Sequence, residues 1–555
     1  MIINNSPPDQ HWPVVVVGAG PAGLTAAITL ARSGNEVLVV DSRLAQSSQP
    51  RATVVSLRSM ELFRSWKIDD QIRAGGNDVR WKMLLTSTLA ESAAGKTVDV
   101  GYPTDEQSAV LSPTSVACVP QDHLENVLLD HLRSLPTARL MVGSLVEAVS
   151  QQPDHGIVEI RDRATGAELR VTADYVLGAD GAHSRTRSSI GIGRWSSGRL
   201  LEAVSTVFRA PLWETVGPHR FGLYHVEHPE ATGSFLPAGG RDRWLYSFRW
   251  DPEQEELAEY SEPRLVDLIR AGAGEPDLPV QIDSLGAFSF IASLATHFRL
   301  GRVFLIGDAA HQVTPRGGTG MNTAIADGFD ISWKLTWVLN GWHDDTLLDT
   351  YESERRPVAE HNVTRSIDPE GSRREVSYEL SVDLGGRLRH LWLPHTRTST
   401  LDLLGPGLTL LTTDGSASAA SPSGIPVRRH VLDSVTARAL GIHSNTGLLL
   451  RPDGLPWPEE SPRYLPGRAA PRPLSLSGEG GIESGRWWIE GQPLDEPECL
   501  RGADQPVHPG VLPLDRQRPG VADGVEHPEA VLPGDVPVAR RDEVPTASRV
   551  GPGQV

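Results

Sequence analysis

The hydrophobic pattern of the chain is most regular near its start. Val14 to Val17 form a run of β-branched residues, which predicts a buried strand. The segment TAAITLARSG, which follows GAGPAG, has apolar residues at helical spacing, and EVLVVD predicts a second strand that ends at Asp41. This part of the chain therefore predicts a β-α-β unit.

Farther along, the pattern changes twice. Helical and strand-like segments alternate up to VTADYVLGADG, whereas the next hundred residues contain short apolar runs separated by Gly, Pro and His, which predict an antiparallel sheet. The strand RVFLIGD and a long helix from about Thr319 then restore the α/β pattern. We expect a Rossmann-like α/β domain interrupted by a second domain. The first is built from 13–80, 115–194 and 296–365, and the second from 81–114 and 195–295.

The last third of the chain has weaker patterning. Residues 366–457 contain HLWLPHTRTSTLDLLGPGLTLLT and close near LLLRPDG, which predicts one further small domain. Beyond Trp457 prolines are frequent and no apolar periodicity is sustained. A segment of this composition buries too little apolar surface to offset its ordering entropy. We expect 458–555 to be a proline-rich, poorly ordered tail.

Composition and charge narrow the classes of function. A chain of 555 residues exceeds what one hydrophobic core usually holds, which agrees with several domains. Its net charge of -18 and the lack of a Lys/Arg block argue against nucleic-acid binding. Two cysteines, Cys118 and Cys499, are too few for a disulfide scaffold or a cysteine-based zinc site. The N-terminus has no signal pattern and no long apolar stretch occurs, so we expect a soluble, cytoplasmic protein.

The first βα turn carries a glycine motif with phosphate-binding spacing. Gly18, Gly20 and Gly23 form G-x-G-x-x-G directly between the predicted strand and helix. The first glycine permits the tight turn, the second lets the backbone approach a pyrophosphate, and the third allows the helix to pack closely on the strand. Asp41, at the end of the next strand, can accept hydrogen bonds from an adenosine ribose. The motif predicts a dinucleotide site without separating NAD from FAD; the alternative is a tight turn that binds nothing.

Two later segments favour FAD. The first is YVLGADGAHSRTRSSIGI, which contains Asp180, and the second runs from Arg302 to Leu335. In the second segment Asp308 sits at a strand end, where its carboxylate can accept from ribityl hydroxyls. A glycine-rich turn after Pro315 then leads into a helix whose first amides can face the pyrimidine edge of a flavin. These amides belong to Gly320, Met321 and Asn322.

Together the three segments resemble the class A flavoprotein monooxygenases, the aromatic hydroxylases related to p-hydroxybenzoate hydroxylase. The resemblance covers about residues 13–365 and includes PRATVVSLRSMELF, where Arg51 matches an arginine that the family places near the flavin. It also includes VPQDHLENVLLDHL, where Gln121 matches a flavin-contacting glutamine. Val146 falls where the family has a backbone contact to adenine.

The resemblance implies FAD and NAD(P)H as cofactors and O2 as co-substrate. NAD(P)H reduces the FAD, oxygen adds to form a flavin hydroperoxide, and an electron-rich phenolic carbon attacks it. Arg51 and Pro315 are the residues expected closest to the reacting flavin. At the end of the second strand the family commonly has Glu followed directly by Arg or Lys, whereas this chain has Asp41, Ser42 and Arg43. The expected cofactor-binding residues are Gly18, Gly20, Pro21, Ala22, Gly23, Asp41, Ser42, Arg43, Arg51, Gln121, Val146, Asp180, Gly307, Asp308, Pro315, Gly318, Gly320, Met321 and Asn322.

Finer resemblances concern the third domain and the substrate. Residues 366–457 resemble the thioredoxin-like domain of the phenol-hydroxylase branch; they lack Cys-x-x-Cys, so we expect a role in packing or dimer support. STLDLLGPGLTLLT and residues 101–125 resemble actinomycete polyketide hydroxylases such as the tetracenomycin and anthracycline hydroxylases. These features imply a phenolic or polycyclic aromatic substrate and a monomer or homodimer. We expect no metal, nucleic-acid or membrane partner.

Several alternatives stay open at this point. The same flavin chemistry can instead perform a Baeyer-Villiger oxygenation of a polyketide ketone, and a flavin-loaded binding protein is a rival outside the enzymes. His311, beside the flavin motif, is either a proton-transfer group or a structural residue. Strand aromatics between 221 and 250 either line a substrate pocket or form ordinary core. These aromatics are Phe221, Tyr224, Phe235, Trp244, Tyr246, Phe248 and Trp250.

Overall fold

The N-terminal β-α-β unit is present in the structure, a computed structural model. The structure describes residues 10–45, 47, 49–240, 242–413, 415, 424–443, 446–457 and 474–475. Strand β1 (Gln10–Val17) leads through the glycine turn into α1 (Pro21–Arg32), and β2 (Val37–Asp41) follows. Every residue of β2 is buried. This burial explains why the strand reads as a continuous apolar run rather than an alternating one.

The sheet around β1 is mainly parallel. Its strands lie in the order β16-β17-β10-β1-β2-β7. Val16 of β1 lies opposite Val39 of β2 on one side and Leu177 of β10 on the other, both in parallel register. The remaining strands are β7 (Ala138–Val142), β8 (Ser144–Gln151), β9 (Gly156–Asp162), β10 (Glu168–Gly178), β16 (Arg299–Leu300) and β17 (Val303–Leu305). Strands β8 and β9 join as an antiparallel pair through β10.

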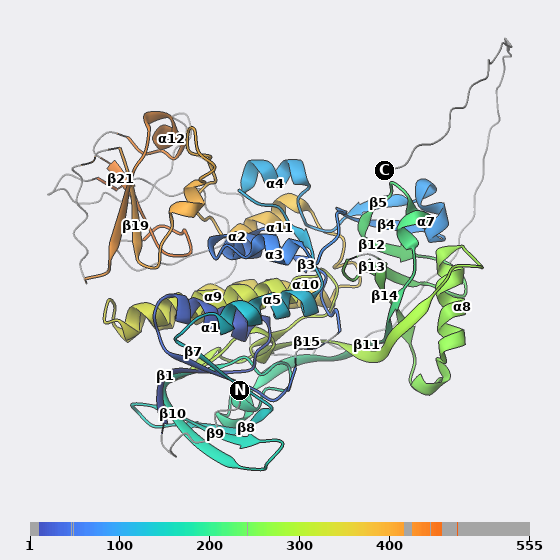
Figure 1. The fold of residues 1–555 in the computed structure, drawn as a ribbon, viewed down its shortest axis with the longest axis horizontal. Helices are drawn as coiled ribbons and strands as arrows, with labels where there is room; N and C mark the ends of the chain where they lie inside the picture. Colours follow the sequence, from blue (N-terminus) through green and yellow to red (C-terminus); the bar gives the residue numbers. More distant parts are fainter. Residues whose placement is uncertain are drawn as a thin grey trace, which may run out of the picture. The chain divides into compact units, whose positions relative to one another are not determined.

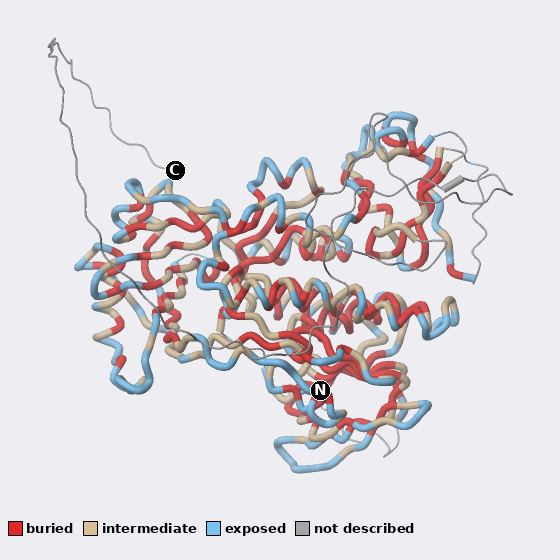
Figure 2. Tube along the Cα trace, turned by 180° about the vertical axis from the view of Figure 1, so that it is seen from behind, coloured by how far each residue is buried: buried red, intermediate tan, exposed pale blue. Residues whose placement is uncertain are grey.

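Helices cover one face of this sheet and the β8–β9 pair covers the other (Figure 1). The helical layer contains α1, α5 (Gln121–Arg133) and α9 (Gly320–Leu339), and α10 (Thr350–Ile367) packs on α9. A Cβ on Gly328 would lie 2.4 Å from the carbonyl oxygen of Ala22, so this glycine lets α9 approach α1 closely. Figure 2 shows buried residues concentrated in these layers. The predicted mixed α/β fold is therefore confirmed.

A second sheet is built from the interrupting segments. Its order is β18-β15-β11-β14-β13-β12-β4-β5, and the long strands β11 and β15 connect it to the first domain (Figure 1). Its strands are β4 (Arg80–Thr86), β5 (Lys96–Asp99), β11 (Arg194–Arg209), β12 (Phe221–Val226), β13 (Gly233–Pro237), β14 (Arg243–Trp250), β15 (Gln281–Ala295) and β18 (His311–Gln312). The prediction of an antiparallel sheet is wrong for one pair, because β4 runs parallel to β12. β4 comes from the earlier excursion and enters the sheet by a long connection, which permits parallel pairing.

One face of the second sheet packs against α7 (Leu212–Val216), α8 (Glu262–Ala273) and the 3-10 helix η1 (Leu89–Ala94). This core contains most of the aromatics considered above as pocket walls: Phe221, Tyr224, Phe235, Trp244, Tyr246 and Phe248, all at most 9% exposed. Trp250 packs against the same core. The pocket-lining hypothesis is therefore wrong for these residues, because α7 and α8 cover the face on which they lie.

Shorter elements lie between these longer strands and helices. They are β3 (Val54–Val55), α2 (Leu57–Ser65), α3 (Asp69–Arg73), α4 (Asp105–Leu111), β6 (Ala117–Cys118), α6 (Arg185–Ser189), η2 (Leu257–Glu259), η3 (Gly307–Ala309), η4 (Asp345–Asp349) and α11 (Val376–Leu384). Ser56 caps the start of α2: its hydroxyl accepts from the Ser59 amide and donates to Asp383 at 3.1 Å, so α11 docks against this cap. Cys118 is buried, and burial raises the pKa of its thiol to about 12.

The C-terminal unit is a four-stranded sheet in the order β20-β19-β21-β22. It contains η5 (Thr400–Leu403), β19 (Leu408–Thr412), β20 (Val427–Val431), α12 (Ser434–Ala439), β21 (Thr446–Leu450) and β22 (Leu474–Ser475). Arg451 fixes this unit to α10 through two 2.8 Å bonds to Glu354, which also accepts from Lys334 of α9 at 2.9 Å. Apart from β22, the predicted tail 458–555 lies outside the described residues. Among the described helices none is long and apolar enough to cross a membrane.

Candidate functional site

The carboxyl ends of four parallel strands meet at one edge of the first sheet. β1 ends directly before Gly18, β2 ends at Asp41, β10 ends before Ala179, and β17 ends shortly before Gly307. The Ala179 amide donates to the Val17 carbonyl at 2.8 Å, which ties the loop after β10 to the end of β1. Ligands of open α/β sheets bind at this edge. The three segments that the sequence assigns to one cofactor are thus brought together in space.

The three motif glycines differ in why the position requires a residue without a side chain. A Cβ on Gly18 would lie 2.4 Å from the Ala179 carbonyl oxygen, and its φ of +107° is one that L side chains rarely adopt. A Cβ on Gly23 would lie 2.0 Å from the Gly18 carbonyl oxygen. A Cβ on Gly20 meets nothing within 4 Å, and φ there is -83°. Gly18 and Gly23 are therefore required by packing, whereas Gly20 borders open space at the start of α1, whose first residues include the predicted Pro21 and Ala22.

The carboxylate of Asp41 is fully engaged. It accepts from the Ala19 amide at 2.6 Å and from the Arg43 amide at 2.7 Å. The Arg43 guanidinium supplies two more bonds, each of 3.2 Å. Because a carboxylate has about four acceptor positions, a ribose hydroxyl at this carboxylate must replace the Arg43 side chain. The sequence predicted the carboxylate here but did not predict that Arg43 binds it. Ser42, between them, lies in the same strand-end loop and its carbonyl accepts from Arg163 at 3.0 Å.

Asp180 organises its own loop. Its carboxylate accepts from the Ser184 hydroxyl at 2.5 Å and from the Thr186 amide at 2.9 Å, which fixes the start of α6. Arg187 of α6 then donates to the Ala309 carbonyl at 2.8 Å. The motif around Asp180 thus connects the loop after β10 to the loop after β17. In the structure the Asp180 and Arg187 side chains form hydrogen bonds within the protein, and contact of Asp180 with a cofactor stays a prediction.

Asp308 is exposed to solvent at this edge of the sheet. The residue is exposed, although protein surrounds its carboxyl on the inner side. This surrounding protein raises the pKa of the Asp308 carboxyl, and the charges of His311 and Arg51 act in the opposite direction. Gly307, before it, adopts φ +59° and a Cβ there would lie 3.0 Å from Ala22. The carboxylate is therefore available to a ligand, in contrast to that of Asp41.

His311 has a structural role in this arrangement. Its Nε2 lies 2.5 Å from Asp327 Oδ2, and Asp327 also accepts from the Arg355 guanidinium at 2.8 Å and the Gly307 amide at 3.1 Å. Both His311 and Asp327 are at most 1% exposed. Burial alone would raise the pKa of Asp327, but His311 and Arg355 lower it. This buried charge cluster fixes the backbone that precedes Asp308, which favours the structural interpretation of His311 over proton transfer.

Helix α9 begins where the glycine-rich turn ends. Gly320 is its first residue, and the first amides of a helix, here including those of Met321 and Asn322, have no acceptor within the helix. The Asn322 side chain points away from that end: its Oδ1 accepts from the Ser56 amide at 2.8 Å, and its Nδ2 donates to the Val54 carbonyl at 3.2 Å. The side chain holds the helix start, which leaves the helix amides for an anionic group.

The remaining predicted residues lie around this edge. Arg51 and Pro315 are exposed. The Gln121 amide donates to the Ala52 carbonyl at 2.8 Å, so the start of α5 contacts the segment that carries Arg51, and the Gln121 side chain donates to Glu125 at 2.7 Å. Val146 lies in β8 and is 5% exposed, so its contact with adenine stays a prediction.

The second sheet presents its other face to this region. Ser284 accepts from the Gln49 side chain at 3.0 Å, and the Arg316 guanidinium lies 5.5 Å from the ring centre of Phe290. Phe288 stacks on Phe290 with ring centres 5.5 Å apart. Ser284, Gly286, Phe288 and Phe290 alternate along β15 in regular register and so share this face.

Near the other end of the sheet, Trp81 and Tyr102 pack with their ring centres 5.5 Å apart, and Tyr102 donates to the Gly318 carbonyl at 2.9 Å. None of these aromatic residues was predicted from the sequence. The small residues alternating with phenylalanine in SLGAFSF were the available signal for a sheet face with room beside it. A flat ligand between this face and the turn at Pro315 would lie against aromatic rings.

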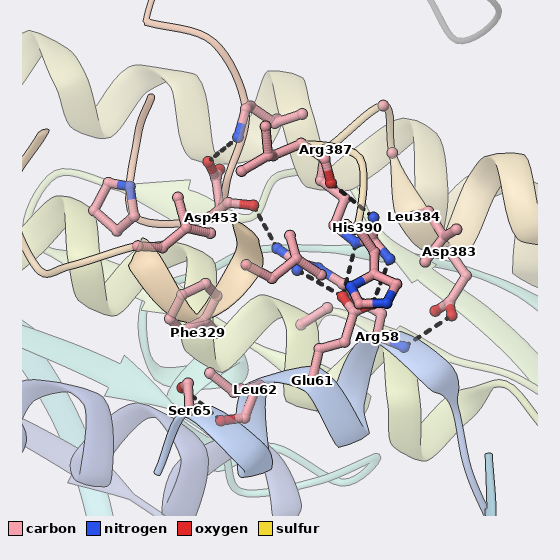
Figure 3. A pocket seen from close by; sticks show the side chains of 18 of the residues that line it. Arg58, Glu61, Leu62, Ser65, Phe329, Asp383, Leu384, Arg387, His390 and Asp453 are labelled. Carbon is pink, nitrogen blue, oxygen red and sulfur yellow. Dashed lines mark hydrogen bonds and ion pairs between the residues drawn. The ribbon is translucent and has the colours of Figure 1, made fainter. Parts of the chain in front are cut away.

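A large cavity of about 2330 Å³ lies elsewhere, between α2, α9, α11 and the C-terminal unit (Figure 3). Of the predicted cofactor residues only Asn322 is among those that line it. Figure 3 shows its charged side chains directed at one another, as in the Glu61–Arg387 pair, and Arg58 donates to the Asp453 carbonyl at 2.5 Å. This cavity is therefore a junction between domains and separate from the sheet edge.

Comparisons with known proteins agree with the geometry. The family described as "FAD binding domain" matches residues 11–366. A predicted polyketide hydroxylase from Streptomyces halstedii is 35% identical over 362 residues, which are 64% of this chain and 64% of that protein. The tetracenomycin A2 monooxygenase-dioxygenase of Streptomyces glaucescens is 30% identical over 545 residues, with 83% of this chain and 95% of that protein covered. The crystal structure of aklavinone-11 hydroxylase with FAD and aklavinone has a TM-score of 0.71 and 30% identity, covering 81% of this chain and 95% of that one.

Proposed function

The chain belongs to the FAD-binding-domain family of flavoprotein monooxygenases, and from this membership we propose that it hydroxylates a phenolic, polycyclic aromatic of polyketide type. The resemblance to class A aromatic hydroxylases is thereby confirmed; such an enzyme uses FAD as its cofactor and consumes NAD(P)H and O2. One observation supports the substrate class most: an open sheet face carrying Phe288 and Phe290 lies against the turn that bears Pro315.

The residues at the sheet edge fit FAD. Gly20 borders open space at the start of α1, as a pyrophosphate requires. Asp308 offers an exposed carboxylate to hydroxyl groups, and the start of α9 offers amides to the electron-rich edge of the ring. When bound, FAD supplies the electron transfer from NAD(P)H and the activation of O2. These donors and acceptors support the proposal that this edge binds FAD.

The adenosine end of the site requires one rearrangement. The ribose contact assigned to Asp41 needs an acceptor position that the Arg43 guanidinium holds. We propose that Arg43 moves toward the diphosphate, where its charge is favourable, and frees Asp41 for the ribose. Arg43 is 35% exposed and carries a long side chain, so this movement needs no change in the backbone.

The protein contributes mainly positioning and exclusion of water. We propose that Arg51 and the turn at Pro315 border the reacting edge of the ring, opposite the sheet face with Phe288 and Phe290. A flat substrate stacked on these rings would present its carbon to the flavin at short range, and proximity of this kind accounts for a large share of catalysis. Gly286 leaves space beside the two rings, since a Cβ there meets nothing within 4 Å.

We also propose the domain limits. Residues 13–80, 115–194 and 296–365 form the FAD-binding domain, and 81–114 and 195–295 form the substrate domain. Residues 366–457 form a thioredoxin-like domain that supports packing or dimerisation. The four-stranded sheet flanked by α12 and the ion pairs of Arg451 support a packing role.

A substrate-dependent oxidation assay tests this function. The purified protein should bind FAD, release it on acid precipitation, and oxidise NAD(P)H faster when polycyclic phenols are added. A product that gains one oxygen without ring opening, assigned by NMR, supports hydroxylation, whereas a lactone or opened ring supports the Baeyer-Villiger reaction. FAD binding without any substrate stimulation across such a panel would instead favour a binding protein.

A further inference from the structure

The turn before α9 is held from outside at almost every residue. Thr314 donates from its hydroxyl to the Ser366 carbonyl at 2.7 Å, and Arg316 donates to the Ile367 carbonyl at 3.0 Å. Arg374 donates to the Gly317 carbonyl, Tyr102 donates to the Gly318 carbonyl at 2.9 Å, and Arg365 donates to the Thr319 hydroxyl at 3.1 Å. Of the turn residues, Pro315 is the one that faces solvent without a bond of this kind to the described residues.

Two of these anchors share one carboxylate. Glu379 of α11 binds Arg365, and Arg374 donates to the same oxygen at 3.1 Å. The side chains of all three are largely buried: Arg365 is 12% exposed, Arg374 3% and Glu379 9%. Burial alone would raise the pKa of Glu379, but His361 and the two arginines lower it to about 2. The carboxylate is therefore ionised at neutral pH and orients both guanidinium groups toward the turn.

This arrangement has a specific mechanical effect. Gly317 and Gly318 both have positive φ, and neither has a side chain to pack, so the turn depends on contacts to its carbonyls. A guanidinium is a planar fork with several fixed donors, and Arg374 uses one branch for Glu379 and the other for Gly317. A small cavity of about 60 Å³, lined by polar and apolar residues, lies beside Arg374 and Glu379. Loss of Arg374 would open this cavity to the carbonyl and let water replace the bond.

We infer that Arg374 and Glu379 are positioning residues for the oxygenation: they hold the turn at Pro315 to Gly318 in the geometry that directs oxygen to the substrate. The inference rests on the proposed function, because it assumes that this turn borders the flavin. It extends that function to residues beyond 366, the last residue of the family match. Segment 374–384, which leads toward the C-terminal unit, thereby becomes part of the site.

The consequence concerns how electrons from NAD(P)H are used. Productive turnover converts NAD(P)H, one proton, O2 and the aromatic to NAD(P)+, the hydroxylated aromatic and water. When the substrate carbon and the flavin edge are misaligned, NAD(P)H, one proton and O2 give NAD(P)+ and H2O2 instead. A displaced turn should therefore raise the share of H2O2 more than it changes flavin binding, because the pyrophosphate and ribose contacts lie at other strands.

The test compares matched variants of the FAD-loaded full chain. We call the Arg374–Glu379 pair, with its bond to the Gly317 carbonyl, the clamp. Arg374→Met and Glu379→Gln remove the clamp, whereas Arg373→Met and Glu375→Gln change exposed neighbours. Fluorescence titration measures the FAD dissociation constant, the visible spectrum reports the flavin environment, and product and H2O2 are counted per NAD(P)H. We expect the clamp variants to lose product per NAD(P)H at least about fivefold, with H2O2 rising to match and a shifted flavin spectrum. The control variants should behave as the wild type does.

Two milder variants keep the inference testable if Arg374→Met does not fold. Arg374→Lys retains the charge but not the fork, and Tyr102→Phe removes one hydroxyl bond to Gly318 while it keeps the ring. Both should show the same change to a smaller degree. Clamp variants that bind FAD and keep wild-type product per NAD(P)H and spectrum would overturn the inference while leaving the proposed function intact. A wild type that binds no FAD would overturn both.

Discussion

Replacing Gly20 by valine separates cofactor binding from folding. The backbone at Gly20 has φ -83° and a Cβ there meets nothing within 4 Å, so the apoprotein accommodates the side chain. Valine is a poorer N-cap than glycine, which costs about 1 kcal/mol, and the reduced entropy of the unfolded chain offsets about 0.4 to 1 kcal/mol of this. The net change in the free energy of unfolding should therefore stay within about 1 kcal/mol.

The same substitution should abolish most FAD binding. The valine methyl groups occupy the open space at the start of α1, where the pyrophosphate must approach the backbone. We expect the FAD dissociation constant to rise at least about 100-fold, equivalent to about 2.8 kcal/mol. Urea unfolding of the apoprotein and fluorescence titration with FAD measure the two quantities separately.

Gly23→Val is the matched comparison for Gly20→Val. Valine at Gly23 would place Cβ 2.0 Å from the Gly18 carbonyl oxygen, so folding and binding should fail together. The reasoning is refuted if Gly20→Val binds FAD as the wild type does, or if it unfolds the apoprotein as Gly23→Val does. Either result would mean that the open space beside Gly20 is not the pyrophosphate site.

Three further predictions concern the substrate face and the buried charges. Gly286→Val should fill the space beside Phe288 and raise the KM for a polycyclic substrate about tenfold (about 1.4 kcal/mol) with FAD affinity unchanged. Ala287→Val, on the opposite face of β15, should leave both the KM and the FAD affinity unchanged. The same KM in both variants would contradict the assignment of the faces. Asp327→Asn should lower the free energy of unfolding by about 3 kcal/mol, because it leaves Arg355 without its buried counter-charge and replaces the carboxylate that binds His311. The exposed Asp267→Asn should change it little in the same urea titration. The pKa of Glu379 in the folded protein, about 2, lies below the ordinary glutamate pKa of 4.5, so its stabilising contribution is complete above pH 4.5 and is lost as pH falls toward 2. The stability difference between wild type and Glu379→Gln should therefore shrink by about 2 kcal/mol from pH 7 to pH 3, and a constant difference would show that the ion pairs do not stabilise the fold.

Local patterns were sufficient to predict that the proposed cofactor residues meet at one edge of the first sheet. A strand that runs directly into a turn and then a helix is recognisable in the sequence. This pattern located the glycines of the first turn, Asp308 and the start of α9. Parallel strands then bring their carboxyl ends to one edge, so residues more than a hundred positions apart meet without any further information. The mixed α/β fold followed from the same alternation of apolar periods.

Residues whose roles depend on distant packing could not be predicted. A strand such as RWLYSFRW indicates that alternate residues share a face, but not which face the later helix α8 covers. The sequence therefore left open whether these aromatics form core or line a pocket. The side chain of Arg43 can bind Asp41 or a phosphate, and the sequence favours neither. Arg374 reaches Gly317 across a separation of 57 residues from a segment with no regular pattern. The parallel pairing of β4 with β12 likewise depends on a connection between separate excursions.

The transfer of oxygen to an aromatic substrate tests the central claim most directly. The FAD-loaded protein is incubated with NAD(P)H, heavy-oxygen-labelled O2 and the polycyclic phenol that stimulates NAD(P)H oxidation most, and the product is analysed by mass spectrometry and NMR. The account predicts one labelled oxygen atom per product molecule, placed as a new hydroxyl on an intact ring. An unlabelled product, or consumption of NAD(P)H that yields H2O2 alone with every such substrate, would contradict it.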